Sequence, residues 1–275
     1  MQLNTIYPNC KIVLAGDERC RVKDGYDIRQ YYTTSIPKDK VYIPLGPRYD
    51  TWASFKKLRE ASSSSSSVPN NFVLKPPSMR TYAFNAIFSQ STSAERVQLA
   101  NIIRENKRHA SSPLSIFERM AKQWTSDVNA LDTQQLNTDR YVEILLDSIF
   151  TLSPAGHNPE CYRLYEAIEM GSIPIIVKSP SNHTATPRQH HPCKDALKPW
   201  HDAPIVVLQS WEDLYPTVET LIQDLDYLDS MQTHLRTWYD NHMRTIVGNF
   251  EKYMLKSMKE GEEVDEKEPT KPPPY

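Results

Sequence analysis

Glycine is scarce in this 275-residue chain: it has seven glycines, where average usage would give roughly 19. No two of them lie within five positions of each other. This spacing excludes the G-x-G-x-x-G dinucleotide loop and the G-x-x-x-x-G-K-[ST] phosphate loop, which need closely spaced glycines. A nucleotide site in this protein would have to use other groups.

Cysteine, excess charge and long apolar runs are also in short supply. The net charge of −2 gives no electrostatic footprint for nucleic acid, no run of about 18 apolar residues could span a membrane, and no signal peptide is visible at residues 1–9. The four cysteines are widely spaced without a C-x-x-C, so we expect small buried or free thiols. One disulfide, Cys161 to Cys193, is the alternative if the chain is secreted.

Apolar segments of strand length recur along the chain. Most are continuous and not alternating, which is typical of strands buried on both faces of a parallel sheet. They cover residues 11–15, 41–45, 81–88, 149–152, 173–177 and 205–208. Helical patterns lie between several of them, so we predict an α/β fold with a mainly parallel sheet.

Helix ends are also marked. Thr92 and Glu95 form a capping-box pattern before the apolar stripe of residues 97–103, and Asn137 or Thr138 can cap the next helix. Asn158-Pro159 predicts the start of a third helix, which Gly171 would follow. Two apolar helices, near residues 214–228 and 231–254, are expected to close the core.

Composition divides the chain into four parts. Residues 1–60 form a partial α/β portion with two predicted strands, and residues 61–77 form a serine-rich linker that includes Ser62–Ser67. Residues 78–256 form the core domain, and the charged, proline-rich residues 257–275 are expected to be disordered. The first part is too short for an independent α/β domain. It either packs on the core or is the end of a larger domain.

The loop Ser153–Asn158 follows a predicted strand and precedes a predicted helix. It therefore lies at the carboxyl edge of the sheet, where open parallel sheets bind ligands and a helix amino terminus attracts anions. Glu160, Arg163 and Glu166 are spaced to share one helix face. Arg163 can meet a phosphate, and Glu166 can accept the two hydroxyl hydrogen bonds of a ribose. A surface helix with ordinary ion pairs is the alternative.

Over a dozen positions around this loop follow one spaced pattern: Leu145-Leu146, Ser148, Phe150, Leu152, Pro154, Gly156, Arg163, Glu166-Ala167, Gly171 and Ile173-Pro174-Ile175-Ile176. The pattern resembles the donor domain of the exostosin-like glycosyltransferases, glycosyltransferase family 47. The resemblance covers roughly residues 78–250, including Arg80–Phe88, Arg96 and Trp211. Residues 16–18, 29–32 and 43–46 are similar to the ribitol xylosyltransferase branch.

The resemblance implies a GT-B fold with two Rossmann-like domains and a cleft between them. The carboxyl-terminal domain, here residues 78–256, would bind a nucleotide-sugar, usually a UDP-sugar, without a metal or other cofactor. Glu166 matches the glutamate expected on the ribose, and Arg163 the arginine expected near the diphosphate. The loop that approaches the donor matches Gly156 and its neighbours Ser153, His157, Asn158 and Glu160. The family's location would be the Golgi lumen.

Inverting transfer also needs a base for the acceptor hydroxyl and cations or dipoles on the leaving group. Asp17 and Glu18 follow the strand 11–15 and are the only acidic pair of the first part in such a position. Either could be the base, or an ordinary loop carboxylate. Arg80 and residues 89–91 are further candidates to face the donor, and His157 could contact sugar or phosphate.

The first part is shorter than the amino-terminal domain of a full GT-B enzyme, so two functions stay open. One is a glycosyltransferase that transfers sugar to a glycan or glycoconjugate hydroxyl. The other is a catalytically inactive nucleotide-sugar-binding remnant or interaction protein.

Four further motifs suggest other functions. Histidine with cysteine suggests zinc, but the spacing of His183, His190, His191, Cys193 and His201 matches no standard site, so we predict no metal. Asn182-His183-Thr184 is a glycosylation sequence that matters only in the secretory pathway. Asp224-Leu225-Asp226 is expected to be exposed helix charge, and Pro272–Tyr275 has the form of a weak WW-domain ligand.

Overall fold

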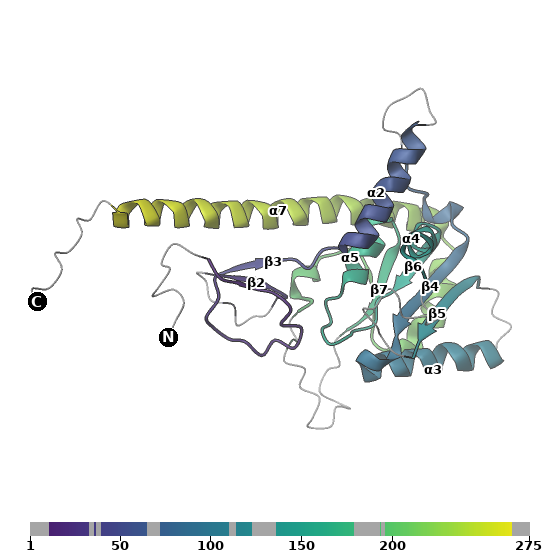
Figure 1. Cartoon of the computed structure of the whole chain (residues 1–275). Coiled ribbons are helices and arrows are strands. Elements are labelled where there is room, and N and C mark those ends of the chain that lie inside the picture. Colours follow the sequence, from purple (N-terminus) through teal and green to yellow (C-terminus); the bar gives the residue numbers. More distant parts are fainter. Residues whose placement is uncertain are drawn as a thin grey trace, which may run out of the picture.

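The computed structural model describes residues 11–32, 36, 40–64, 72–109, 114–122, 136–178, 193 and 196–265. They form two parallel sheets with helices around them (Figure 1). The main sheet has the strand order β5-β4-β6-β7-β8, and every neighbouring pair is parallel. Its strands are β4 (Tyr82–Ser89), β5 (Ile116–Ala121), β6 (Ser148–Leu152), β7 (Ile173–Val177) and β8 (Val206–Leu208). The predicted α/β fold with parallel strands is therefore confirmed.

The order of these strands indicates the edge of the sheet at which a ligand is expected to bind. Phe84 of β4 pairs with Ile116 of β5 on one side and with Phe150 of β6 on the other, so the direction of strand addition reverses between β4 and β6. At such a reversal the connections leave toward opposite faces of the sheet and open a crevice beyond the carboxyl ends of the two strands. In this chain β4 ends at Ser89 and β6 ends just before residue 153.

The main sheet is covered on both faces. Phe84, Phe150 and Ile175 are fully buried, as the continuous apolar runs predicted. The helices are α3 (Ala94–His109), α4 (Thr138–Leu146), α5 (Tyr162–Glu169), α6 (Leu214–Leu221) and α7 (Leu225–Asp265). Short 3₁₀ segments are η1 (Pro77–Met79), η2 (Gln90–Thr92), η3 (Lys198–Trp200) and η4 (Trp211–Asp213).

Two of the predicted helix caps have different outcomes. The Asn137 side chain accepts a hydrogen bond from Arg140 N at 2.8 Å and caps α4, as predicted. For α3 the predicted capping box on Thr92 is wrong, because Thr92 lies in η2. Ser93 Oγ takes its place and accepts from Arg96 N at 3.3 Å.

The helix predicted to begin at Pro159 begins three residues later. Asn158 Oδ1 accepts a hydrogen bond from Glu160 N at 2.8 Å, which holds residues 158–160 in a turn before α5. Glu160 therefore lies outside the helix and does not share its face with Arg163. The other end is as predicted, since Gly171 follows α5 with a φ of +71° that favours glycine.

A second, smaller sheet comes from the first part of the chain. It contains β1 (Val13–Leu14), β2 (Ile28–Gln30) and β3 (Val41–Ile43), all parallel, and α2 (Tyr49–Ser64) follows it. The apolar runs missed β2 and β5, because both strands carry charged residues: Arg29 in one, Glu118 and Arg119 in the other. Helix α2 was also missed, and it includes the first three serines of the predicted linker.

The first part packs on the core, as one of the two alternatives expected. Phe55 of α2 packs with Val142 and Leu145 of α4, and α7 passes beside β3 (Figure 1). Because α7 continues to Asp265, residues 257–265 are helical and not disordered as expected, while 266–275 lie outside the described residues. In the described chain, α7 and the other helices are too short or too polar to cross a bilayer.

Candidate functional site

The candidate site is the loop between β6 and α5, at the carboxyl edge of the main sheet. Ser153 N donates to Ile175 O at 2.9 Å, and Gly156 N donates to Asn158 O at 3.1 Å, so the loop folds back on itself. Glu95 of α3 accepts from Ala155 N at 3.0 Å, although sequence analysis placed it in a capping box. The loop is therefore anchored to the start of α3.

Arg96 of α3 bridges the two strand ends. Its Nε donates to Ala155 O at 3.2 Å, and its Nη1 donates to Ser89 O at 3.3 Å. A Cβ added at Gly156 would lie 3.0 Å from Arg96 Nη2, so glycine allows this close approach. Burial and then the nearby cation of Arg163 lower the pKa of Arg96 to about 10. Two arginines whose charges interact therefore lie at this edge of the sheet.

Arg163 of α5 forms no ion pair with any residue that the structure describes. Its Nε and Nη1 atoms are buried and make no hydrogen bond with any described residue. The two flanking carboxylates are occupied by others: Tyr141 Oη donates to Glu166 Oε2 at 2.6 Å, and Tyr42 Oη donates to Glu160 Oε1 at 2.6 Å. The alternative of a surface helix with ordinary ion pairs is therefore wrong.

The two glutamates also connect the first part of the chain to the core. Glu166 Oε1 accepts from Arg48 N at 3.3 Å, ahead of α2. Glu160 is 1% exposed, and besides Tyr42 of β3 it accepts from Tyr165. Burial raises the pKa of Glu160, and the hydrogen bonds from the two tyrosines oppose this rise. Neither carboxylate is an open surface group.

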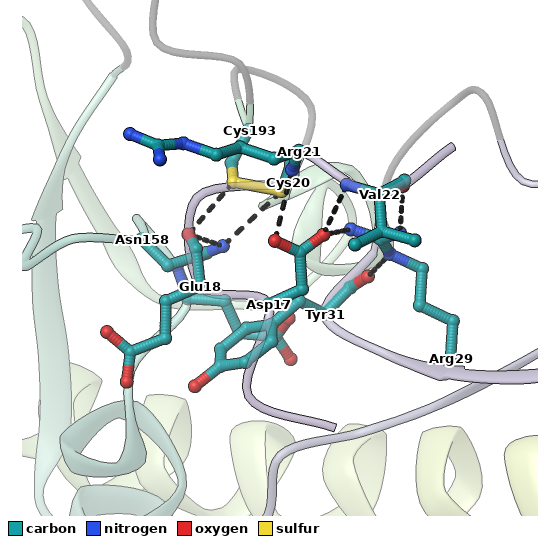
Figure 2. The surroundings of a disulfide bond; sticks show 10 residues. Asp17, Glu18, Cys20, Arg21, Val22, Arg29, Tyr31, Asn158 and Cys193 are labelled. Atoms are coloured by element: carbon teal, nitrogen blue, oxygen red, sulfur yellow. Dashed lines mark hydrogen bonds and ion pairs between the residues drawn. A yellow bond between two sulfur atoms is a disulfide. The ribbon is translucent and has the colours of Figure 1, made fainter. Parts of the chain in front are cut away.

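Glu18 and His157 meet, although 139 residues separate them. His157 Nδ1 lies 3.1 Å from Glu18 Oε2. Asn158 Nδ2 donates to Glu18 O at 3.0 Å (Figure 2). The His157 and Glu18 side chains are 40% and 45% exposed. The structure therefore brings the candidate base from the first part to the candidate donor loop.

Asp17, unlike Glu18, has its hydrogen-bond partners within the first part of the chain. It accepts from Arg29 Nη2 at 2.8 Å and from the N–H groups of Arg21 and Val22 at 3.0 Å each (Figure 2). Burial by itself would raise the pKa of Asp17, but these hydrogen bonds outweigh burial and hold the pKa below its usual value. Asp17 therefore fixes a turn and has little capacity left to take a proton.

Arg80 lies at the other edge of the sheet, because it precedes β4 whereas the loop follows β6. Its guanidinium donates to four carbonyl oxygens, at 2.8–3.1 Å, of Lys75, Leu145, Ser148 and Met170. Burial lowers its pKa to about 10. These bonds tie the ends of α4 and α5 to β4, so the structure does not bring Arg80 to the loop.

The cysteines do not pair as the sequence suggested. Cys20 is joined to Cys193, with their Cα atoms 5.4 Å apart, so the pair Cys161–Cys193 is wrong. Cys161 is free, and its Sγ lies 3.2 Å from Ser153 Oγ. Cys10 lies outside the described residues. The disulfide joins the turn after β1 to the segment before η3.

The competing motifs fall partly outside the described residues, namely Asn182, His183, His190, His191 and Pro272–Tyr275. Cys193 is in a disulfide and so offers no thiolate to zinc. His201 instead contacts Asp202 at 2.9 Å, and no group of three or more metal-binding side chains occurs in the described chain. Asp224 Oδ1 accepts from Tyr227 N at 2.9 Å and caps α7.

Sequence reasoning missed three residues of this arrangement: Arg96, Tyr42 and Tyr141. Arg96 fell within the region of resemblance but carried no signal for its carbonyl contacts. The two tyrosines reach the glutamates from other elements, so local spacing could not have found them.

Comparison with known proteins agrees with the fold and the loop pattern. The RXYLT1 C-terminal domain family matches residues 66–258. Ribitol-5-phosphate xylosyltransferase 1 of mouse is 27% identical over 182 residues, 65% of this chain and 38% of that protein. The human protein of that name is 30% identical over 142 residues, 51% of this chain, and the zebrafish one 25% over 176 residues, 62% of this chain. The matches span only 30%, 37% and 38% of the human, zebrafish and mouse relatives. The chain belongs to the RXYLT1 C-terminal domain family, among the exostosin-like glycosyltransferases.

Proposed function

We propose that this chain binds a nucleotide-sugar, a UDP-sugar, at the loop 153–161 and transfers the sugar to a hydroxyl group. The observation that carries the proposal is the Arg163 guanidinium, which has two buried N–H groups without a partner in the described chain. Its charge is close enough to lower the pKa of the buried Arg96, which lies at the strand reversal. Two cations that lie near each other in a partly buried place repel, and an anion close to both would offset that cost.

A diphosphate fits these groups. Arginine presents planar, permanently charged donors that match phosphate oxygens, and the amino terminus of α5 adds free N–H groups. Together they would neutralise the charge that develops on the leaving UDP, so the proposed reaction needs neither a metal nor another cofactor. Glu166 is the proposed ribose contact, because each of its carboxylate oxygens can accept a second hydrogen bond.

Glu18 is the proposed base, and Asp17 is not. In the inverting step the acceptor oxygen attacks the anomeric carbon, the bond from that carbon to the diphosphate breaks, and the hydroxyl proton passes to the Glu18 carboxylate. Glu18 is half-exposed beside the donor loop, whereas Asp17 is committed to Arg29 and to two backbone N–H groups. Because Asp17 and Glu18 are adjacent carboxylates with different partners, a substitution of Asp17 is the control for a substitution of Glu18.

The names of the relatives suggest the substrates. They are called ribitol-5-phosphate xylosyltransferases, so we propose xylose as the sugar and a ribitol phosphate unit of a glycoconjugate as the acceptor. The Cys20–Cys193 disulfide supports an oxidising compartment such as the Golgi lumen, because disulfides are rare in the cytosol.

Calorimetry with UDP tests the donor site. We expect heat of binding for the wild type and at least about ten-fold weaker binding for Glu166→Ala, since a lost hydrogen bond to a charged group costs about 1.5–3 kcal/mol. Absence of UDP-dependent heat from the folded wild type would exclude the donor site. Equal affinity in both proteins would remove Glu166 from it.

A nucleotide-sugar-binding remnant without activity is the second candidate. It is favoured by Glu166, whose two oxygens already accept from Arg48 N and Tyr141 Oη. UDP-xylose turnover distinguishes the two: binding of UDP without any UDP release from UDP-xylose supports the remnant, and release supports the enzyme.

A further inference from the structure

The turn at residues 17–20 is fixed from two sides. Cys20 N donates to Asp17 O at 3.0 Å, and Cys20 has a φ of +51°, the left-handed conformation that few non-glycine residues adopt. Asp17 is tied to Arg29 within the small sheet, while Cys20 is tied to Cys193 in the core (Figure 2). A strained residue persists only where its surroundings over-determine it. The disulfide and the Asp17 bonds provide this constraint.

Glu18 lies between these two anchors and faces the donor loop. Its carbonyl oxygen accepts from Asn158 Nδ2, and its carboxylate meets His157, the residue before Asn158. Asn158 is 4% exposed and is itself held, because its Oδ1 accepts from Glu160 N. The Glu18 carboxylate is also close enough to Arg96 to interact with its charge.

The contact between His157 and Glu18 cannot hold the turn by itself. Both side chains are almost half exposed, and exposed ion pairs gain little because water screens them and side-chain entropy opposes them. The backbone anchors, Asn158 and the disulfide, must therefore set the position of Glu18.

We propose that the Cys20–Cys193 disulfide and Asn158 position Glu18 against His157, and that His157 orients the Glu18 carboxylate for proton transfer. This inference rests on the proposed function. His157 Nδ1–H donates to Glu18 Oε2, which leaves Oε1, with no hydrogen bond from the described chain, to accept the proton of the acceptor hydroxyl. His157 and the disulfide are positioning groups, so their loss lowers the rate of transfer but not the affinity for UDP.

Nuclear magnetic resonance of ¹³C-labelled histidines tests the positioning without requiring activity. In the otherwise wild-type chain, Glu18→Gln should shift the ring signal of His157, which is identified by its loss in His157→Leu. In a Cys20→Ser/Cys193→Ser background the same Glu18→Gln change should shift that signal much less. A shift of equal size in both backgrounds, or no shift in either, overturns the proposal.

A second variant covers the case in which the serine pair fails to fold. Asn158→Asp loses the N–H that bonds Glu18 O but keeps the oxygen that accepts from Glu160 N. It should reduce the effect of Glu18→Gln on the His157 signal in the same way, whereas Cys161→Ser, which leaves the disulfide intact, should not.

Turnover of UDP-xylose tests the role in transfer. His157→Leu should lower kcat by about ten-fold or more, since small misplacement of a catalytic group can cost up to about 100-fold, while the Kd for UDP stays unchanged. His157→Asn retains a donor near the position of Nδ1 and should recover part of the rate. Equal rates in His157→Leu and the wild type overturn the role of His157. A wild type that binds UDP but does not turn over UDP-xylose instead contradicts the proposed enzyme, and the resonance experiment still decides the positioning.

Discussion

Tyr141 Oη donates to Glu166 Oε2 at 2.6 Å, across 25 residues and from helix α4 to helix α5. Glu166 is three residues from Arg163 in the sequence, but its carboxylate accepts a hydrogen bond from the Tyr141 hydroxyl. Tyr42 and Tyr165 do the same for Glu160. Arg163 Nε and Nη1 remain buried without a hydrogen bond in the described chain, as does Glu160 Oε2, and an external anion is the partner that we propose for the arginine.

Replacing Arg163 by glutamine should weaken UDP binding by about ten-fold or more, because charge-assisted hydrogen bonds contribute about 1.5–3 kcal/mol each. The free energy of unfolding should stay the same or rise, since the arginine has no ion pair in the described chain to lose. Calorimetry and denaturant unfolding measure the two quantities. A strong loss of stability with unchanged UDP affinity would assign Arg163 a structural role.

Arg80→Gln should show the opposite result. Arg80 donates to four carbonyl oxygens at the amino edge of the main sheet, so the variant should lose about 3 kcal/mol or more of unfolding free energy. The folded fraction should bind UDP as tightly as the wild type. Weaker UDP binding at full stability would return Arg80 to the donor site.

Glu18→Gln and Asp17→Asn should separate catalysis from structure. Loss of a general base typically lowers kcat by about 100- to 10,000-fold, so Glu18→Gln should show such a loss in UDP-xylose turnover with unchanged UDP affinity and stability. Asp17→Asn should mainly destabilise, by about 3 kcal/mol at pH 7, because it leaves the buried Arg29 without its carboxylate. The reverse result would make Asp17 the base.

The stability difference between wild type and Asp17→Asn should depend on pH. The folded-state pKa of Asp17 lies below its ordinary value of 3.8, so the carboxylate stabilises the fold fully above that value. This contribution is lost as the pH falls from about 4 through the lower folded-state pKa. Unfolding curves of the two proteins should therefore converge in acid, and a difference that grows below pH 4 would contradict the assignment.

Reduction of the disulfide should lower the stability as well. Cys20 and Cys193 are 173 residues apart, and the loop-entropy model gives about 5 kcal/mol for such a long loop. Guanidinium unfolding with and without a reductant measures the difference. Thiol alkylation and mass analysis provide the control: Cys161 should react in the folded, oxidised protein, and Cys20 and Cys193 should react only after reduction.

Local patterns in the sequence account for the main sheet. Continuous apolar runs predict strands buried on both faces, and β4, β6, β7 and β8 lie where those runs lie. Apolar runs did not predict β2 and β5, because Arg29, Glu118 and Arg119 interrupt the apolar character of these two strands. In the small sheet, Arg29 is fully buried and bonds to Asp17 and to backbone carbonyls, which no local rule anticipates.

The candidate site, like the fold, could be predicted from the sequence only in part. The seven glycines excluded the common phosphate loops, and the spaced pattern around Gly156, Arg163 and Glu166 predicted the candidate site at the loop 153–158. The tertiary structure decides which of the charged side chains are engaged by other residues. Glu166 is engaged by Tyr141 and Arg48, Asp17 by Arg29, and Glu18 meets His157 across 139 residues. The sequence determined the local elements and the residue types, because these follow from periodicity. Only the tertiary structure decided the pairings, because a hydrogen bond between distant residues depends on how the chain packs.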